Sequence, residues 1–359
     1  MSISPFMTPG DRSRRREHSR RRRRRRRALL AGALALAIVV VALAESHAGH
    51  SSKSGQARAA QPGHATRTAA PALSASGLPL GKPAFTLSGL ATPLEDPLQI
   101  TFHTPPRAGL LFNLGTGQVL WQRNPFTRLP IASLTKMMTA LLSVQSAPPD
   151  APVLVTRQAV EAAGSKVGVL PLGRHVRLQS MLYGLLLPSG NDAAMALAQH
   201  VAGTARRFVR RMNAEAAKLG MGCTRYSSPS GYVDRGNYSC AADLALLAHV
   251  DLEQPRIASV VRTYTAVLPF PIKGGRLYLY NNNPLLIYGY PGVTGLKTGY
   301  TMAAGKCLVI TAERHGVRLG VVVLNSPDPA IQASELLNSA FEQVYHQAPV
   351  PEPPIPTGI

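Results

Sequence analysis

Segments with strand-like patterns lie near both ends of the folded body, and this arrangement most constrains the fold. Residues 108–112 and 118–122 are apolar segments joined by a turn that contains two glycines, which predicts a hairpin. Residues 307–312 and 317–324 form a second pair of apolar runs of strand length. Most of the chain between the two pairs has helical periodicity. We therefore predict an α/β (α+β) fold with an antiparallel sheet built from N- and C-terminal strands and flanked by helices.

The helix that follows the first hairpin carries two residues that could do chemistry together. Beyond Pro130, apolar residues recur every three or four positions over 134–142, which predicts a helix with one buried face that begins near Ser133. Ser133 and Lys136 are three positions apart, so they lie on the same side of adjacent turns, and the backbone N–H groups of the first turn are free. The same pattern also describes an N-capped helix with a solvated lysine, so partners elsewhere in the chain must decide.

A short loop between two helices is a first candidate partner. Residues 188–191 (Pro-Ser-Gly-Asn) separate helices predicted over 178–187 and 192–201. The tetrapeptide is typical of an ordinary turn and needs no further explanation as one. On a loop between two rigid helices, however, Ser189 could relay a proton and Asn191 could hold a substrate amide.

A predicted strand supplies a second candidate partner. Lys297 and Thr298 lie between Gly295 and Gly299 in this strand. A lysine in such a place is usually exposed on the surface. The two glycines nevertheless remove side chains on either side of Lys297 and Thr298, which would let a substrate backbone approach the strand edge closely.

The three motifs together resemble the active-site triplet of the penicillin-binding proteins and serine β-lactamases. In chain order they are Ser133-x-x-Lys136, Ser189-Gly190-Asn191 and Lys297-Thr298-Gly299. Their flanking residues, 132–140, 187–194 and 295–301, are similar to those of the low-molecular-mass D-alanyl-D-alanine carboxypeptidases. The resemblance covers residues 105–345 and implies a β-lactamase/DD-peptidase-like fold, with the site in a cleft between the helical lobe and a sheet edge.

The resemblance also implies roles for individual residues. Ser133 would be the acylated nucleophile, Lys136 its general base and Ser189 a proton relay. The implied substrate-binding residues are Asn191, Lys297, Thr298, Gly299, Tyr300 and Thr301. Among these, Lys297 and Thr298 would bind the terminal carboxylate, and the backbone N–H of Tyr300 would form an oxyanion hole with that of Ser133. Thr301 is a further candidate for binding the carboxylate, because an arginine common in the family is missing here. A serine is a poor nucleophile unless a neighbour takes its proton, and a lysine can do so only when neutral.

The resemblance favours a serine D-alanyl-D-alanine carboxypeptidase that acts on peptidoglycan stem peptides, needs no cofactor and is inhibited covalently by β-lactams. Carboxypeptidases of this family often carry an arginine after the final strand, whereas residues 319–359 contain no Lys or Arg. A D,D-endopeptidase that cleaves cross-links with the same site is therefore the first alternative. A β-lactamase is disfavoured because no Glu-x-x-x-Asn element lies between Asn191 and Lys297. A non-catalytic wall-binding module is the alternative from another class.

The N-terminal region predicts export or attachment to the cytoplasmic membrane. Twelve arginines between Arg12 and Arg27 precede seventeen residues without charge, 28–44. This pattern fits a secretory signal cut after Ala42-Leu43-Ala44, or an uncleaved anchor. An arginine-rich arm can also bind nucleic acid, but the apolar segment beside it makes a topology signal the simpler interpretation, so no nucleic-acid partner is expected. We expect the protein outside the cytoplasm, in the periplasm or cell wall.

The chain therefore divides into five predicted parts. These are an Arg-rich cytoplasmic n-region (1–27), a signal peptide or membrane anchor (28–44), a disordered linker (45–96), a DD-peptidase catalytic domain (97–346) and a Pro-rich tail (347–359).

Three cysteines are too few for a disulfide scaffold. Cys223 and Cys240 could pair in an oxidising compartment or remain free. Cys307 lies inside an apolar run and is expected to be a buried small hydrophobe. Because no Cys/His cluster has the spacing of a zinc site, no metal is expected.

Overall fold

The computed structural model describes residues 85–90, 96–351 and 354–356. The predicted n-region 1–27 and apolar segment 28–44 lie outside the described residues, as does most of the predicted linker 45–96. Within the described ranges, no helix is both long enough and apolar enough to cross a membrane.

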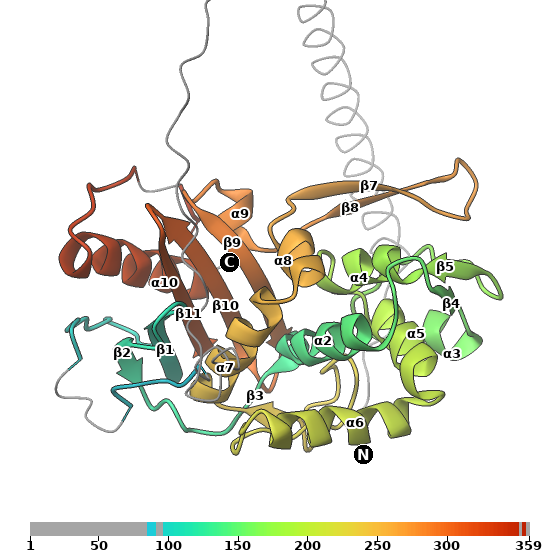
Figure 1. Cartoon of the computed structure of the whole chain (residues 1–359), viewed down its shortest axis with the longest axis horizontal. Helices are drawn as coiled ribbons and strands as arrows, with labels where there is room; N and C mark the ends of the chain where they lie inside the picture. Colours follow the sequence, from blue (N-terminus) through green and yellow to red (C-terminus); the bar gives the residue numbers. More distant parts are fainter. Residues whose placement is uncertain (1–84, 91–95, 352–353, 357–359) are drawn as a thin grey trace, which may run out of the picture. The chain divides into compact units, whose positions relative to one another are not determined.

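A five-stranded antiparallel sheet forms the centre of the described domain, in the order β2-β1-β11-β10-β9 (Figure 1). Its strands are β1 Ala108–Asn113, β2 Val119–Arg123, β9 Val293–Thr301, β10 Gly305–Arg314 and β11 Val317–Ser326. β1 pairs with β11, with Leu110 opposite Val322. This pairing confirms that strands from both ends of the domain build one sheet. β9 pairs only with β10, so one edge of β9 remains open to the helical side.

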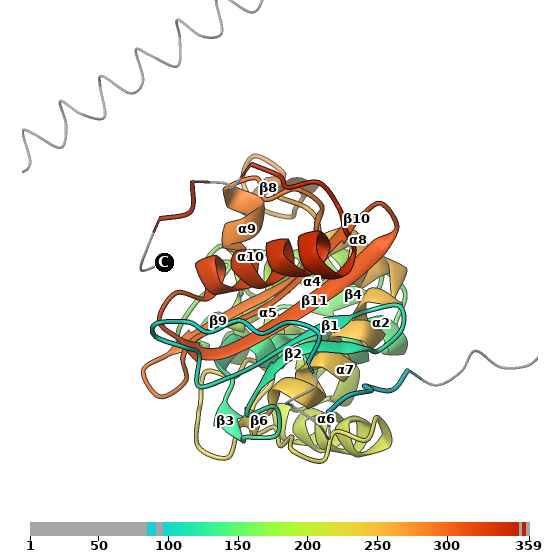
Figure 2. The same cartoon turned by 90° about the vertical axis from the view of Figure 1, so that its left-hand side faces the viewer.

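Both faces of the sheet are buried. Because side chains alternate along a strand, Val322 and Leu324 of β11 join the core beneath the helical lobe, whereas Val321 and Val323 join a second core on the other face. Figure 2 shows helix α10 (Pro329–Ser339) lying along that second face. Burial on both faces explains why these strands are continuous apolar runs in the sequence instead of alternating patterns.

Helices gather on the other side of the sheet and form the predicted lobe (Figure 1). On both sides of the sheet together, the helical segments of the described domain are η3 Ala132–Thr135, α2 Lys136–Ser146, α3 Arg157–Val160, α4 Leu178–Leu186, α5 Asn191–Ala202, α6 Ala205–Lys218, α7 Ala241–Leu252, α8 Pro255–Val261, α9 Pro284–Ile287, α10 and the π-helical turn η4 Ala340–Val344. Of these, α10 and η4 pack on the face opposite to the lobe. The helix predicted to begin near Ser133 therefore starts as a 3-10 turn and continues as α2. Its apolar face is fully buried, as the periodicity predicted.

Three short antiparallel ladders complete the domain. They are β3 Leu129–Pro130 with β6 Tyr238–Ser239, β4 Pro152–Leu154 with β5 His175–Arg177, and β7 Thr265–Pro269 with β8 Arg276–Tyr280. The β3–β6 ladder lies directly before η3 in the chain. It therefore ties the segment that enters η3 to the segment that enters α7.

Part of the predicted linker packs on the domain. Phe85, Leu87 and Leu90 are half-buried against the core beneath the lobe. The backbone N–H of Ser88 donates to the carbonyl of Gly117, and the N–H of Val119 donates back to Ser88. Residues 85–90 are therefore part of the folded domain, because their apolar side chains find a surface that the composition of the linker did not indicate.

Candidate active site

The 3-10 turn η3 presents Ser133 to a cleft between the lobe and β9. The turn is closed by a hydrogen bond from the N–H of Leu134 to the carbonyl of Ile131, 3.1 Å long. Ala132 adopts a left-handed conformation, with φ of 46°, which is strained for a residue with a Cβ. The hydroxyl of Thr135 donates back to the carbonyl of Ala132 and holds this conformation. Ser133 is thus fixed at the sharp start of a helix in which residues 134–143 are buried.

Lys136 contacts Ser133 and two further groups. Its Nζ lies 2.8 Å from the Oγ of Ser133, 2.7 Å from the Oδ1 of Asn191 and 2.9 Å from the backbone carbonyl oxygen of Ser230. The last two groups can only accept a hydrogen bond, whereas the serine hydroxyl can also donate one. A neutral amine has two N–H groups and one lone pair. The arrangement therefore suits a neutral Lys136 that donates to Asn191 and Ser230 and accepts from Ser133.

The surroundings of Lys136 favour this neutral form. The side chain is completely buried, and burial lowers its pKa well below the usual value for lysine. The positive charge of Lys297 lowers the pKa further, and the negative charge of Asp192 opposes the two effects. Lys136 is therefore equipped to take the proton of Ser133.

The Ser189-Gly190-Asn191 loop joins α4 to α5. The side-chain amide of Asn191 donates to the carbonyl of Ala163, which aims its oxygen at Lys136. Ser189 has a φ of 63° and its Oγ is buried, yet no described polar atom hydrogen-bonds with that oxygen. The hydroxyl predicted to relay protons thus lines the cleft with its hydrogen-bonding capacity unused.

β9 brings the third motif to the cleft. Lys297 is 1% exposed, and its Nζ donates to the carbonyl of Thr298 at 2.9 Å. Burial lowers the pKa of Lys297 to about 7. This lysine is therefore not the exposed surface residue that such a pattern usually describes.

The two glycines of β9 accommodate the protein itself. A Cβ at Gly299 would lie 3.2 Å from the backbone nitrogen of Ser133 and 2.9 Å from the carbonyl of Ile131. A Cβ at Gly295 would lie 2.7 Å from the side chain of Val261 in α8. That these glycines also admit a substrate backbone stays a prediction. Their lack of a side chain allows η3 and α8 to pack directly against β9.

The cleft has a volume of about 540 Å³. Of the predicted site residues, its walls contain Ser133, Ser189, Thr298, Gly299 and Tyr300. Lys136, Asn191 and Lys297 are buried behind these walls. Thr301 differs from the rest, because its hydroxyl donates to the Oδ1 of Asp234 at 2.9 Å and accepts from the N–H of Ala304 at 3.1 Å. Its only proton is thus engaged.

A loop that the motifs did not indicate supports Lys136 and the turn that carries Ser133. A disulfide between Cys223 and Cys240, whose Cα atoms are 5.7 Å apart, closes residues 224–239. Besides the Ser230 carbonyl on Lys136, this loop supplies Asn237, whose side-chain amide donates to the hydroxyl of Thr135 at 2.9 Å. Because Ser230 contacts Lys136 through its backbone carbonyl, the residue types in the sequence could not predict this contact.

The comparisons with known proteins agree with this geometry. The sequence profile of the D-alanyl-D-alanine carboxypeptidases (Peptidase_S11) matches residues 103–328. The chain belongs to this family. The predicted resemblance is thereby confirmed.

Relatives in the carboxypeptidase family are named for two different activities. The D-alanyl-D-alanine carboxypeptidase DacF of Bacillus subtilis is 34% identical over 245 residues, which are 66% of this chain and 62% of that protein. A D-alanyl-D-alanine endopeptidase of Pseudomonas aeruginosa is 33% identical over 242 residues, which are 63% of this chain and 77% of that protein. The chain thus spans about three-fifths of the Bacillus relative.

The fold also matches that of a solved family member. The crystal structure of the Streptomyces K15 DD-transpeptidase superposes with a TM-score of 0.63 at 30% sequence identity, covering 68% of this chain and 99% of that one. The predicted β-lactamase/DD-peptidase-like fold is confirmed.

Among the residues that the structure describes, one cluster consists of side chains of the kinds that bind metal ions. It contains Cys223, Cys240 and Asp243. The two sulfurs are bonded to each other, so neither is a thiolate ligand. Asp243 accepts instead from the N–H of Cys223 and from the hydroxyl of Thr224. Cys307 is buried, as predicted.

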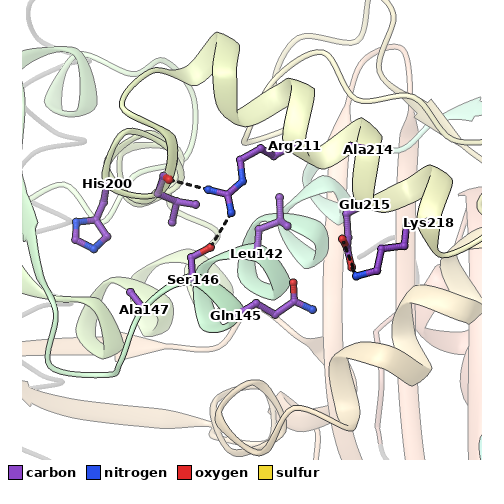
Figure 3. A pocket seen from close by; sticks show the side chains of 10 residues that line it. Leu142, Gln145, Ser146, Ala147, His200, Arg211, Ala214, Glu215 and Lys218 are labelled. Carbon is purple, nitrogen blue, oxygen red and sulfur yellow. Dashed lines mark hydrogen bonds and ion pairs between the residues drawn. The ribbon is translucent and has the colours of Figure 1, made fainter.

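A second hollow lies on the helical lobe of this family member, away from the three motifs (Figure 3). It has a volume of about 580 Å³ and is lined by residues of α2, α5 and α6. In Figure 3, Arg211 of α6 reaches toward Ser146 at the end of α2, and the distance from its Nη2 to the Oγ of Ser146 is 3.3 Å.

Proposed function

We propose that this protein is a serine D-alanyl-D-alanine carboxypeptidase that removes the terminal D-alanine of peptidoglycan stem peptides through an acyl-enzyme on Ser133. One observation carries the proposal. The buried Nζ of Lys136, with its lowered pKa, lies 2.8 Å from the Oγ of Ser133. Family membership and the matching fold support the same activity.

Acylation begins when neutral Lys136 takes the proton of Ser133 and Oγ attacks the carbonyl carbon of the penultimate D-alanine. The carbonyl oxygen becomes an oxyanion, which the backbone N–H groups of Ser133 and Tyr300 stabilise. The intermediate collapses, and the bond to the terminal D-alanine nitrogen breaks. That nitrogen receives the proton from Lys136 through Ser189, whose unpartnered Oγ lines the same cleft. Water then attacks the ester carbonyl carbon while Lys136, neutral again, takes a proton from it. The bond from that carbon to the Oγ of Ser133 breaks, Lys136 gives the proton to Oγ, and the shortened peptide leaves with a new carboxyl group.

Two groups of residues hold the peptide. Lys297 and Thr298 bind the terminal carboxylate, and the open edge of β9 pairs with the extended backbone. Asn191 contacts a substrate amide with its side chain and keeps Lys136 in place. Lys297 is charged below a pH of about 7, and a bound carboxylate favours its charged form further.

A D,D-endopeptidase that cleaves cross-links is the second candidate. A relative named as an endopeptidase is 33% identical to this chain. In addition, residues 319–359 contain no Lys or Arg that could hold a terminal carboxylate from the end of the sheet. The two activities share the same acylation step and differ only in the group that leaves.

The protein works outside the cytoplasm in this proposal. The arginine run and the apolar segment 28–44 support export or tethering to the cytoplasmic membrane. Its partners are peptidoglycan stem peptides and, as covalent inhibitors, β-lactams, whose strained amide presents the same kind of carbonyl to Ser133.

Labelled penicillin tests the acyl-enzyme. We expect the full-length protein to form a stable adduct that peptide mapping places on Ser133. Ser133→Ala should form none, and Ser146→Ala, which removes an exposed hydroxyl beside a cation in the second hollow, should react like the wild type. No adduct on the wild type, or an adduct on Ser133→Ala, would refute the proposal. Rapid turnover of penicillin would identify a β-lactamase instead.

Product analysis chooses between the two peptidase activities. A stem pentapeptide and a cross-linked dimer are offered at equal concentration. Release of D-alanine from the pentapeptide identifies the carboxypeptidase, and conversion of the dimer to monomers identifies the endopeptidase.

A further inference from the structure

A carboxylate lies beside Thr301, the last residue of β9, four residues beyond Lys297. Asp234, on the disulfide-closed loop, accepts the hydroxyl proton of Thr301 through its Oδ1 at 2.9 Å. Thr301 therefore cannot donate that proton to a substrate carboxylate, and the negative charge beside it would repel one. The predicted place of Thr301 among the carboxylate-binding residues does not fit this contact.

The charge of Asp234 has no cationic partner in the described structure. The ion pairs seen among described residues include those of Arg157 with Glu161, Lys218 with Glu215 and Arg318 with Glu253. Asp234 belongs to none of them and is only partly buried. Its Oδ2 makes no hydrogen bond with any described residue, so one carboxylate oxygen remains able to accept from a ligand.

The spacing along β9 relates Asp234 to the substrate, given the proposed function. With the terminal carboxylate at Thr298, an added strand follows β9 toward Thr301, three residues or roughly 10 Å away. Two D-alanines span roughly 7 Å of this path in an extended chain. The residue that precedes them thus lies beside Tyr300 and Thr301. A long side chain on that residue reaches the carboxylate of Asp234.

We propose that Asp234 is a specificity-determining residue that selects an ammonium-bearing side chain on the residue preceding D-alanyl-D-alanine. Lys297 in the middle of β9 attracts the anionic end of the peptide, and Asp234 beside the last residue of β9 attracts its cationic side chain. The two charges also fix the direction in which the peptide lies along the strand. This inference rests on the proposed function and names the substrate class of that site.

Two peptides that differ in one charge test the inference. They are acetyl-L-lysyl-D-alanyl-D-alanine with a free ε-ammonium group and the same peptide acetylated on that nitrogen. We expect the full-length protein to release D-alanine from the charged peptide with a roughly fivefold higher kcat/KM, as for one partly exposed ion pair. Added salt should reduce this ratio, because it screens the pair.

Substitutions at Asp234 test whether its carboxylate causes the preference for the charged peptide. In Asp234→Asn the ratio should fall to about one, and in Asp234→Glu it should recover in part, as expected for one screened ion pair. Asp150→Asn, which removes an exposed carboxylate elsewhere in the lobe, should keep the wild-type ratio. A penicillin adduct on Ser133 verifies that each variant is folded.

The outcomes separate this inference from the proposed function. If the wild type cleaves both peptides equally, or if Asp234→Asn keeps the preference, the subsite is refuted while the peptidase stands. If neither peptide is cleaved and no penicillin adduct forms, the proposed function itself fails.

Discussion

Two hollows of similar volume, about 540 and 580 Å³, place a serine beside a basic side chain, and the two basic side chains differ in burial. In the cleft, Ser133 lies 2.8 Å from the completely buried Lys136. In the hollow of Figure 3, Ser146 lies 3.3 Å from Arg211, and both side chains are exposed.

The difference shows that residue types and cavity size do not by themselves make a site. Water stabilises the charge of an exposed cation, and an arginine does not lose its proton in proteins. Burial removes that stabilisation, and the second buried cation, Lys297, adds repulsion, so Lys136 can act as a base. The chemistry of the cleft thus depends on two lysines that are costly to bury.

Loss of the buried base should have the largest effect. We expect Lys136→Met to slow acylation by penicillin by about 10⁴-fold, because no other group accepts the proton of Ser133. Stopped-flow or mass-spectrometric rates of adduct formation measure this. Lys218→Met, which removes an exposed lysine of the second hollow, should react at the wild-type rate. A decrease of less than about tenfold in Lys136→Met would show that Lys136 is not the base, since one tenfold step is only about 1.4 kcal/mol.

The cost of burying Lys297 should appear in stability. Its pKa is lowered on folding to about 7, so between that pH and the unfolded value the unfolded chain binds more protons and stability rises with pH. Lys297→Met should therefore raise the free energy of unfolding at pH 6 by on the order of 4 kcal/mol and weaken its rise toward pH 10. Urea unfolding at pH 6 and pH 9 tests this. Equal pH dependence in wild type and variant would contradict the burial of a cation.

The disulfide should matter next. Replacing Cys223 and Cys240 by Ser removes a cross-link between residues 17 positions apart in the sequence. The free energy of unfolding should therefore fall by about 3 kcal/mol in the chain-entropy model. Acylation should also slow, because the loop carries the Ser230 carbonyl that holds Lys136. Thermal unfolding with and without reductant measures the effect. The double variant is its own control, since reductant should no longer change its stability.

Changes in the second hollow should have the smallest effect. Arg211→Gln removes an exposed cation and two hydrogen bonds at the surface. We expect the free energy of unfolding to change by less than about 0.5 kcal/mol and acylation to stay the same. A tenfold loss of acylation would overturn the contrast between the two hollows.

The sequence by itself determined the fold class and the family. Strand patterns at both ends of the domain and helical periodicity between them are local properties, and they predicted the mixed architecture and the sheet shared by both ends. The three motifs, each weak alone, became specific through their order in the chain. They identified Ser133, Lys136 and Lys297 as candidate active-site residues before any contact was known.

Only the tertiary structure decided how these residues are held and which of them face the substrate. Ser230 supports Lys136 through a backbone carbonyl from a residue 94 positions away, and Asp234 engages Thr301 from a distant loop. Neither contact leaves a pattern in the sequence, because a carbonyl is common to all residues and the partners meet only when the chain packs. The same packing places both lysines out of water. Burial, which no motif encodes, is what lowers their pKa values and turns a serine beside a lysine into a candidate nucleophile.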